Sequence, residues 1–409
     1  MASRNIDSNS RPSGPFEPDY PLQGHPLDLP MADVLTFTAA QRKRYVSKLL
    51  TALARVIQAD KMALKKRVTM KKEMIDLRKL VRLPTDTYLR TDDKTFKRNV
   101  LGKGGPGSTH TFWSRHQMWK METKFGNLEE QVLSKSPALV SQLTKLFDPE
   151  HKSKAGFRSP RHTAVRNALI LIEFDKASGT AFPPFHARYF ADKFLPTEGD
   201  SIVVDPCAGW GGRLIGTLCV PRLGHVQYIG VDPERRNQEA YEGLTRRATV
   251  YLKKEIPGPR SAKVFVAAFE DWVASKTAAR LFGKVNLVMT SPPYFGAENY
   301  NPKNRAQSAN RYKTYEAWRE GFYRPLVKGA FNLLKPNGIF ILNIANVAGA
   351  PKLERDARIL AKEAGFIGNG FFKLALSSRP GVGGKRHVVQ VDGALFKQEP
   401  VFCFRKPAL

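Results

Sequence analysis

The protein has 409 residues, and 42% of them are hydrophobic, which is enough for a sizeable core in one large domain plus a smaller one. This composition excludes a chain that is disordered throughout. Its 66 Lys and Arg residues against 37 Asp and Glu give a formal net charge of +29, which favours a polyanionic partner, nucleic acid first, over a basic protein that is merely soluble or contacts anionic lipid.

The amino-terminal part divides into a tail and a basic helical region. Residues 1–35 are rich in Pro, Ser, Gly and Asp and predict a flexible tail. Apolar residues at helical spacing from residue 36 onward predict a helical domain over 36–175. Residues 41–80 carry 13 Lys or Arg against three acidic residues, so this domain is a candidate for DNA binding, with a solvated helix face as the alternative. The candidate contacts are Lys65, Lys66, Arg67, Lys71 and Lys72.

From residue 176 to 409 the pattern alternates between short strands rich in β-branched residues and longer helices. This alternation predicts an α/β domain with a mostly parallel sheet and helices on both faces. Two final extended stretches, 371–378 and 399–406, are joined by a loop and predict an antiparallel hairpin at the end of the sheet. The other expected strands are 201–206, 226–233, 262–269, 284–290 and 338–345, and the expected helices are 209–218, 235–254, 322–334 and 352–365.

A glycine-rich turn, "DPCAGWGG", follows the first of these strands. Glycines there let a ligand approach backbone N–H groups at the start of a helix, and Asp232 at the tip of the next strand is placed to accept both ribose hydroxyls of an adenosine-containing cofactor. A purely structural strand-to-helix turn is the alternative. The candidate cofactor residues here are Asp205, Cys207, Ala208, Gly209, Trp210, Gly211, Asp232 and Pro233.

The third strand of this region ends in "FEDW". Either Glu270 or Asp271 is placed to meet an adenine amino group, and a helix cap is an equal alternative for each.

The fourth strand ends in the tetrapeptide Ser291, Pro292, Pro293 and Tyr294. Each proline fixes its own φ and restrains the residue before it, so the turn is rigid. The Ser291 hydroxyl and the Pro292 carbonyl can accept the two N–H bonds of an exocyclic amino group, and Tyr294 can stack on a base rotated out of a duplex. Catalysis of this kind depends on orientation and electrostatic complementarity rather than on a strong base.

With these two motifs, residues 180–405 resemble the S-adenosylmethionine-dependent amino-methyltransferases of DNA, the N4-cytosine and N6-adenine group. The resemblance implies a Rossmann-like class I methyltransferase fold with a seven-stranded sheet, S-adenosyl-L-methionine as cofactor, and base flipping. Serine at the first tetrapeptide position is commoner among N4-cytosine enzymes, so Ser291 favours cytosine. The alternatives are N6-adenine methylation, RNA base methylation, or a nucleic-acid-binding protein with a degenerate methyltransferase domain.

Further site residues follow from the resemblance. The segment "FPPFHARYFADKFL" looks like an additional cofactor-contacting motif, with Phe182, Pro183, His186 and Arg188 as candidates and a packing helix with a surface histidine as the alternative. The polar loop after Tyr294 is placed to close over the flipped base or touch DNA, and solvated disorder is the alternative. Its candidate contacts are Asn299, Tyr300, Arg305 and Arg311.

The chain departs from this family in one respect, since no separate target-recognition segment fits between or after the two motifs. We therefore expect the helical domain to bind DNA largely through phosphates, with Lys385 and Arg386 in the hairpin loop adding contacts. Duplex DNA is the expected partner, single-stranded DNA the alternative, and RNA ranks below both. No oligomeric state is predicted.

Cysteines and apolar runs suggest the compartment. The three cysteines, Cys207, Cys219 and Cys403, lack CxxC spacing and indicate neither a disulfide framework nor a zinc site, so no metal is expected. No apolar run approaches the roughly 18 residues of a membrane span, and the amino terminus lacks a signal-peptide pattern and is too acidic for a transit peptide. We expect an intracellular protein of the cytoplasm or nucleoid, or of the nucleus in a eukaryote, with no membrane partner.

Overall fold

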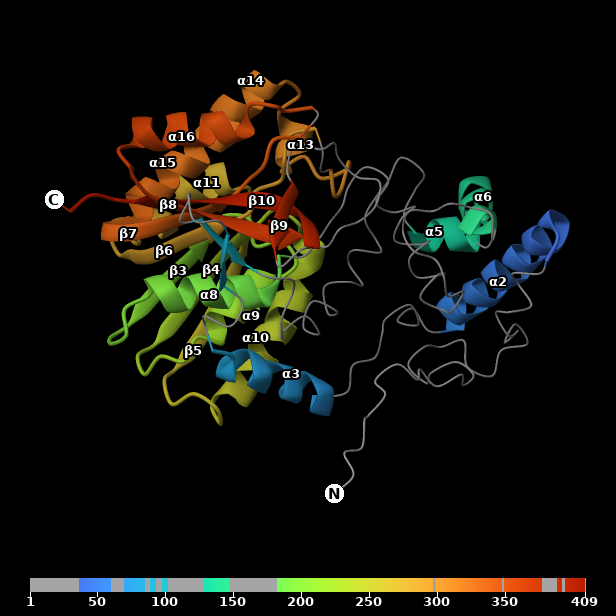
Figure 1. The fold of residues 1–409 in the computed structure, drawn as a ribbon, viewed down its shortest axis with the longest axis horizontal. Helices are drawn as coiled ribbons and strands as arrows, with labels where there is room; N and C mark the ends of the chain where they lie inside the picture. Colours follow the sequence, from blue (N-terminus) through green and yellow to red (C-terminus); the bar gives the residue numbers. More distant parts are fainter. Residues whose placement is uncertain are drawn as a thin grey trace. The chain divides into compact units, whose positions relative to one another are not determined.

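The structure is a computed structural model, drawn in Figure 1, and it describes residues 37–59, 70–84, 89–92, 98–101, 128–146, 182–296, 299–347, 349–376, 388–391 and 394–408. The predicted tail lies outside the described residues. Contacts divide the chain into two compact units: residues 1–67 with 128–172, and residues 68–127 with 173–409.

The first unit is helical in its described part. It comprises α2 (Ala39–Ala59), which contacts both α5 (Leu128–Leu133) and α6 (Pro137–Leu146). Helix α2 begins with a capping box, in which the Gln41 amide donates to the Thr38 hydroxyl at 3.3 Å and the Thr38 amide donates to the Gln41 side chain at 2.7 Å. The described part of its apolar stripe, Val46, Leu49 and Leu50, is buried as the spacing predicts. The buried apolar residues of this unit are Tyr45, Val46, Leu49, Leu50, Val132, Leu139 and Leu143.

The expected helical domain at 36–175 is not one unit, which corrects that boundary. Helix α3 (Met70–Arg82) belongs to the second unit, where Leu77 and Leu80 join the core beside the sheet. Arg78 also donates to Glu255 at 2.7 Å. Helical periodicity marks an apolar stripe but does not say which core will cover it, so the sequence could not assign α3.

One sheet of ten strands organises the described part of the second unit. Its order is β1-β2-β8-β10-β7-β6-β3-β4-β5, with β9 paired to β10. The neighbours from β7 through β6, β3 and β4 to β5 are parallel, whereas β10 runs antiparallel to both β7 and β8. The strands are β1 (Leu89–Asp92), β2 (Arg98–Leu101), β3 (Ser201–Asp205), β4 (Val226–Asp232), β5 (Arg260–Val266), β6 (Val285–Thr290), β7 (Leu334–Asn343), β8 (Ile367–Leu376), β9 (Val388–Val391) and β10 (Ala394–Arg405).

The predicted fold class is confirmed, and each of the seven expected strands is present. The structure adds β1, β2 and β9, and it places β10 between β8 and β7. The expected hairpin is therefore not at the end of the sheet, because β2 pairs in parallel with β8 and continues the sheet beyond it. A pairing partner so distant in sequence leaves no local signal.

Helices cover both faces of this sheet (Figure 1). One face carries α8 (Pro184–Phe194), α9 (Gly212–Leu218), α10 (Gln238–Leu252) and α3, and the other carries α11 (Phe269–Val273), α15 (Arg324–Leu333) and α16 (Leu353–Ala364). The remaining short helical elements are η3 (Arg235–Asn237), α12 (Lys276–Ala279), α13 (Ser308–Arg311), α14 (Tyr315–Trp318) and the π-helical turn η4 (Arg319–Tyr323).

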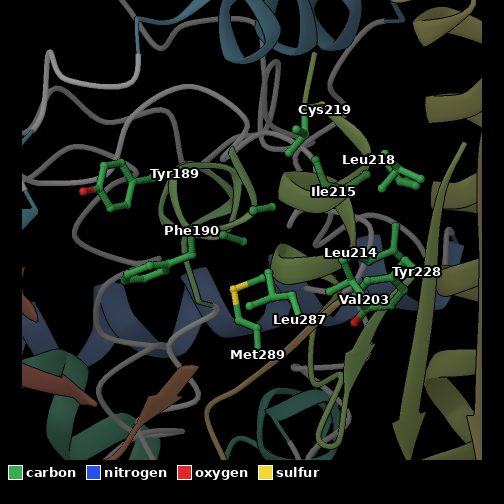
Figure 2. Packing of buried hydrophobic residues seen from close by; sticks show 14 of the residues in the cluster. Tyr189, Phe190, Val203, Leu214, Ile215, Leu218, Cys219, Tyr228, Leu287 and Met289 are labelled. Atoms are coloured by element: carbon green, nitrogen blue, oxygen red, sulfur yellow. The ribbon is translucent and has the colours of Figure 1, made fainter. Parts of the chain in front are cut away.

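Alternate residues of the central strands supply the two cores, as the pleat requires. Val203, Leu287 and Met289 belong to the cluster under α8 and α9, whereas Val204 and Val288 belong to the cluster under α15 and α16. Figure 2 shows the first cluster, where strand residues meet side chains of α8 and α9. Because β3 and β6 are buried on both faces, most of their residues are apolar, although Asn286 interrupts the run in β6.

The strand order reverses between β3 and β6. The chain passes from β3 to β4 and β5 on one side, then returns to the other side of β3 to form β6 and β7. Parallel strands end on a common edge, so the carboxyl ends of β3, β4 and β6 meet at this switch point, where open α/β sheets bind their ligands.

Candidate active site

A buried ion pair holds the start of the glycine turn. The Asp205 carboxylate, fully buried at the end of β3, accepts hydrogen bonds from Arg213 Nε and from the Tyr228 hydroxyl, both at 2.7 Å. Burial alone would lower the pKa of Arg213, but the adjacent Asp205 carboxylate raises it, so the guanidinium stays charged. Arg213 also donates to the carbonyl of Cys207. Asp205 therefore positions the turn from inside the protein.

The glycine turn continues directly into α9. Gly211 is the N-cap of that helix and has φ +80°, a left-handed conformation that favours glycine. The amide of Gly209 donates to Asp232 Oδ2 at 2.8 Å, which joins this turn to the end of β4. Tyr241 of α10 also donates to the carbonyl of Gly209. The predicted turn and Asp232 thus form one connected structure, with Ala208 buried within it.

Asp232 is a buried carboxyl group at the switch point. Besides Gly209, its second oxygen accepts from the amide of Glu234 at 2.9 Å. Burial raises the pKa of Asp232 to about 7, although these two backbone donors favour the ionised form. A buried carboxylate with two backbone donors can accept further hydrogen bonds from the hydroxyl groups of a ligand. A ribose offers two such hydroxyl groups.

The polar loop after the tetrapeptide folds over this carboxyl group. Asn304 donates to the carbonyl of Pro233 at 2.8 Å, and Asn301 donates to Glu234 at 2.9 Å. The ring of Tyr300 meets that of Trp210 edge to face, with centroids 5.9 Å apart. In its described part, residues 299–314, the loop is ordered by its asparagines and lies against the predicted cofactor residues.

At the other end of the loop, a predicted nucleic-acid contact, Arg311, binds two predicted cofactor residues, Glu270 and Asp271. Arg311 pairs with Glu270 at 3.2 Å and with Asp271 at 2.7 Å, and the Tyr312 hydroxyl donates to Glu270 at 3.1 Å. The Arg311 guanidinium therefore fastens the loop to α11 in this structure. Arg305 is exposed and lies elsewhere on the same loop.

The segment before β3 packs against the glycine turn from inside. The carbonyl oxygen of Phe182 lies 1.9 Å from where a Cβ at Gly212 would stand, so only glycine admits this contact. His186 is 1% exposed among the rings of Phe182 and Phe185. Arg188 donates to the carbonyl of Val81 on α3 at 3.0 Å. The helix α8 thus packs against the turn, as the alternative interpretation of this segment expected, but its histidine is buried and not at the surface.

The tetrapeptide follows β6 directly, next to β3 at the switch point. The Ser291 hydroxyl lies 3.3 Å from Oδ1 of Asn343, the last residue of β7. Burial raises the pKa of the Cys207 thiol well above its usual value, and the nearby carboxylates of Asp205 and Asp232 raise this pKa further.

Tyr294 is more enclosed than the sequence suggested. Its side chain is 9% exposed and belongs to the core cluster under α15 and α16, while Ser291 and Pro293 are half-buried. The next residue, Phe295, meets Tyr315 and Trp318 in a cluster of rings. The turn is therefore held by packing as well as by its prolines.

Most of the predicted nucleic-acid contacts lie outside the part of the chain that the structure describes. Lys65, Lys66, Arg67, Lys385 and Arg386 lie outside the described residues, and Lys71 and Lys72 lie on α3 with undescribed side chains. In the first unit, Lys43, Arg44 and Lys48 are exposed along α2.

Several site residues were missed by sequence reasoning. Arg213, Tyr228, Asn304 and Asn343 contact predicted site residues, and Asn301 contacts Glu234 two residues after Asp232, yet none was singled out from the two motifs. The loop's run of asparagines was the one signal that could have pointed to an ordered segment.

Within the described ranges, no group of three or more His, Cys, Asp or Glu side chains could hold a metal ion. Of the helices described here, none combines the length and the apolar character needed to span a membrane.

Comparisons with known proteins show no family for this chain. No protein-family model and no curated protein matches this chain. A protein described as a SAM-dependent methyltransferase from Methanosarcina mazei is 13% identical with a TM-score of 0.33, over 56% of this chain and 99% of that one. A candidate RNA methyltransferase from Pyrococcus horikoshii is 16% identical with a TM-score of 0.31, over 59% of this chain and 98% of that one.

A third similar structure is a candidate DNA modification methylase from Thermus thermophilus, solved with S-adenosyl-L-methionine. It is 18% identical with a TM-score of 0.22, over 34% of this chain and 51% of that one. At these values no cofactor, substrate or partner is carried over to this chain. The strand order with its antiparallel β10 is nevertheless the Rossmann-like class I methyltransferase fold expected from the sequence.

Removing the Asp205 carboxylate should destabilise the folded protein. We expect Asp205→Ala to lower the free energy of unfolding by about 3–5 kcal/mol, because it leaves the buried Arg213 guanidinium uncompensated. Glu255→Ala is the matched control, since it breaks a surface pair with Arg78 and should cost about 1 kcal/mol or less. Urea unfolding followed by tryptophan fluorescence measures both, and equal losses would contradict the positioning role of Asp205.

Proposed function

We propose that the chain is an S-adenosylmethionine-dependent methyltransferase of DNA that modifies the exocyclic amino group of a flipped base, most favourably N4 of cytosine. The observation that carries the proposal is that a buried carboxyl group at Asp232 and the rigid Ser291-Pro292-Pro293-Tyr294 turn both follow strands that end at the switch point. A dinucleotide-dependent hydride transfer would leave the second of these without a role.

The residues at the end of β3 and β4 fit this cofactor. Asp232 would accept the two ribose hydroxyls, and the glycine turn at a helix start would let the rest of a nucleoside approach the backbone closely. The packing of Tyr300 against Trp210 suggests that the polar loop covers the bound cofactor. When bound, S-adenosylmethionine supplies an electrophilic methyl group on a positively charged sulfur.

The tetrapeptide would bind the target amino group. Its nitrogen is a poor nucleophile, because the lone pair is delocalised into the ring. Hydrogen bonds from its two N–H groups to Ser291 Oγ and the Pro292 carbonyl would draw it toward tetrahedral geometry and direct the lone pair to the methyl group. The new N–C bond forms as the C–S bond breaks, and the surplus proton on nitrogen leaves to water. Orientation then supplies the rate enhancement.

DNA binding is proposed for the basic helical unit. Helix α2 carries five Lys or Arg residues and no acidic residue. Three of these, Lys43, Arg44 and Lys48, are exposed beside a buried apolar stripe, so they are available for phosphate contacts. Contacts of this kind position a protein on DNA without reading its sequence, in keeping with the absence of a recognition segment between the motifs.

Cofactor affinity should depend on pH through Asp232. The carboxyl group has a pKa raised to about 7, so it is mostly protonated in mild acid and can accept both hydroxyls fully only after ionising. Affinity for S-adenosylmethionine, measured by calorimetry, should therefore rise with pH and fall by up to about tenfold for each pH unit below about 7.

Two variants make this test specific. Asp232→Asn should bind weakly at every pH, with no such dependence. Asp200→Asn is the control, because Asp200 also accepts a backbone N–H, from His225 at 2.9 Å, but lies before the amino end of β3. A wild-type affinity that is constant between pH 5.5 and 8 would contradict the assignment of Asp232.

Methyl transfer is the direct test of function. Duplex DNA, single-stranded DNA and RNA are incubated with labelled S-adenosylmethionine, and the digested nucleosides are analysed by mass spectrometry. We expect N4-methylcytosine in DNA, reduced about 100-fold or more in Ser291→Ala and also reduced in Tyr294→Ala. Ser275→Ala, which removes an N-cap hydroxyl from α12, should transfer normally.

The alternative outcomes separate the remaining hypotheses. N6-methyladenine or methylated RNA would keep the site and change the substrate. No transfer on any nucleic acid, with DNA binding intact, would favour a binding protein with a degenerate methyltransferase domain.

The affinity for DNA should fall steeply with salt. Replacing Lys43, Arg44 and Lys48 by alanine should reduce the slope of log K against log salt by roughly one for each cation that neutralises a phosphate in the wild type. A control variant replaces Lys276, Arg280 and Lys284, three exposed cations near the amino end of β6, and should keep the wild-type slope. A wild-type slope near zero would refute phosphate-driven binding.

A further inference from the structure

A buried asparagine lies directly behind the proposed catalytic serine. Asn343 ends β7, the strand beside β6, and the register places Leu342 opposite Thr290, so Asn343 stands next to Ser291. Its side chain is 3% exposed. Burying an amide costs free energy unless its polar atoms are hydrogen-bonded, so its partners determine how it is oriented.

The carbonyl of Pro400 on β10 fixes that orientation. Asn343 Nδ2 lies 3.1 Å from this oxygen. A carbonyl oxygen can only accept, so the NH₂ group of Asn343 must face Pro400 and its oxygen must face the other way. The orientation follows from this partner and needs no assumption about hydrogen positions.

The other side of the Asn343 amide faces Ser291. Asn343 Oδ1 lies 3.3 Å from Ser291 Oγ and can only accept, so the serine hydroxyl must donate its hydrogen to the asparagine. The lone pairs of Ser291 Oγ are then left for a ligand. We propose that Asn343 is a positioning residue that makes Ser291 a hydrogen-bond acceptor for the substrate, through the relay Ser291 to Asn343 to the Pro400 carbonyl.

This inference rests on the proposed function, and it deepens the account of what the site accepts. A serine that already donates to Asn343 can accept an N–H from an amino group, but it offers no hydrogen to a carbonyl in the same position. The relay therefore favours a base with an exocyclic amino group over one with a carbonyl there, because two facing acceptors would leave both groups unpaired.

Kinetics test the positioning role. Asn343→Ala should lower kcat roughly 10-fold to 100-fold by releasing the serine hydroxyl, while KM for DNA and Kd for S-adenosylmethionine stay within about threefold, because neither ligand contacts Asn343 in this proposal. Asn286→Ala is the matched control. Asn286 is another buried asparagine that bridges strands, accepting from the Ile202 amide at 3.0 Å, but it lies at the amino end of β6.

The control should lose stability and keep kcat. An unchanged kcat in Asn343→Ala, or an equal loss of kcat in both variants, would overturn the proposal.

A double-mutant cycle tests the relay without relying on activity. Urea unfolding is measured for the wild type, Ser291→Ala, Asn343→Ala and the double variant. If the two side chains are hydrogen-bonded, the shift in midpoint caused by Asn343→Ala should be clearly different in the Ser291→Ala background.

Strictly additive shifts would overturn the relay, whatever the activity. Coupled shifts in a protein that methylates no nucleic acid would sustain the relay and refute the proposed function, so the two failures can be told apart.

Discussion

The site depends on one buried charge pair, Asp205 with Arg213. Asp205 ends β3, Arg213 lies on α9, and the Tyr228 hydroxyl of β4 completes the contact. A buried guanidinium must be paired, so the strand end, the helix start and the neighbouring strand are bound to a single geometry. The glycine turn spans this pair, and Gly209 then reaches Asp232. The predicted cofactor-binding residues keep their relative positions only while this ion pair is intact.

A similar constraint operates on the other side of the switch point. The tetrapeptide is stiffened by two prolines, and Asn343 connects its serine to β10 through the Pro400 carbonyl. Since β10 is antiparallel and inserted between β7 and β8, the last strand of the chain supports the proposed catalytic turn from behind. The polar loop then joins the two sides, because it follows the tetrapeptide and is fastened to the β4 end by Asn301 and Asn304.

Sequence reasoning succeeded where the signal was local and failed where a partner was distant. The strands of the second unit were predictable because β3 and β6 are buried on both faces and are mostly apolar in sequence. The helical stripe of α2 was predictable from its spacing. The sequence did not predict which unit α3 joins or that β2 pairs with β8, because each depends on contacts with residues far away in the chain. Arg311 was expected to face DNA, yet two nearby carboxylates bind it in this structure.

The sequence by itself determined the alternation of strands and helices, the glycine turn, the proline-stiffened turn and the excess of positive charge. These are properties of short segments or of composition, and short-range sterics and hydrophobic periodicity are sufficient to produce them. Only the tertiary structure decided which polar groups face each other: Arg213 to Asp205, Asn304 to Pro233, Asn343 to Ser291. The physical reason is that a hydrogen bond requires two groups within about 3 Å, and strand order, which no short segment encodes, brings them together.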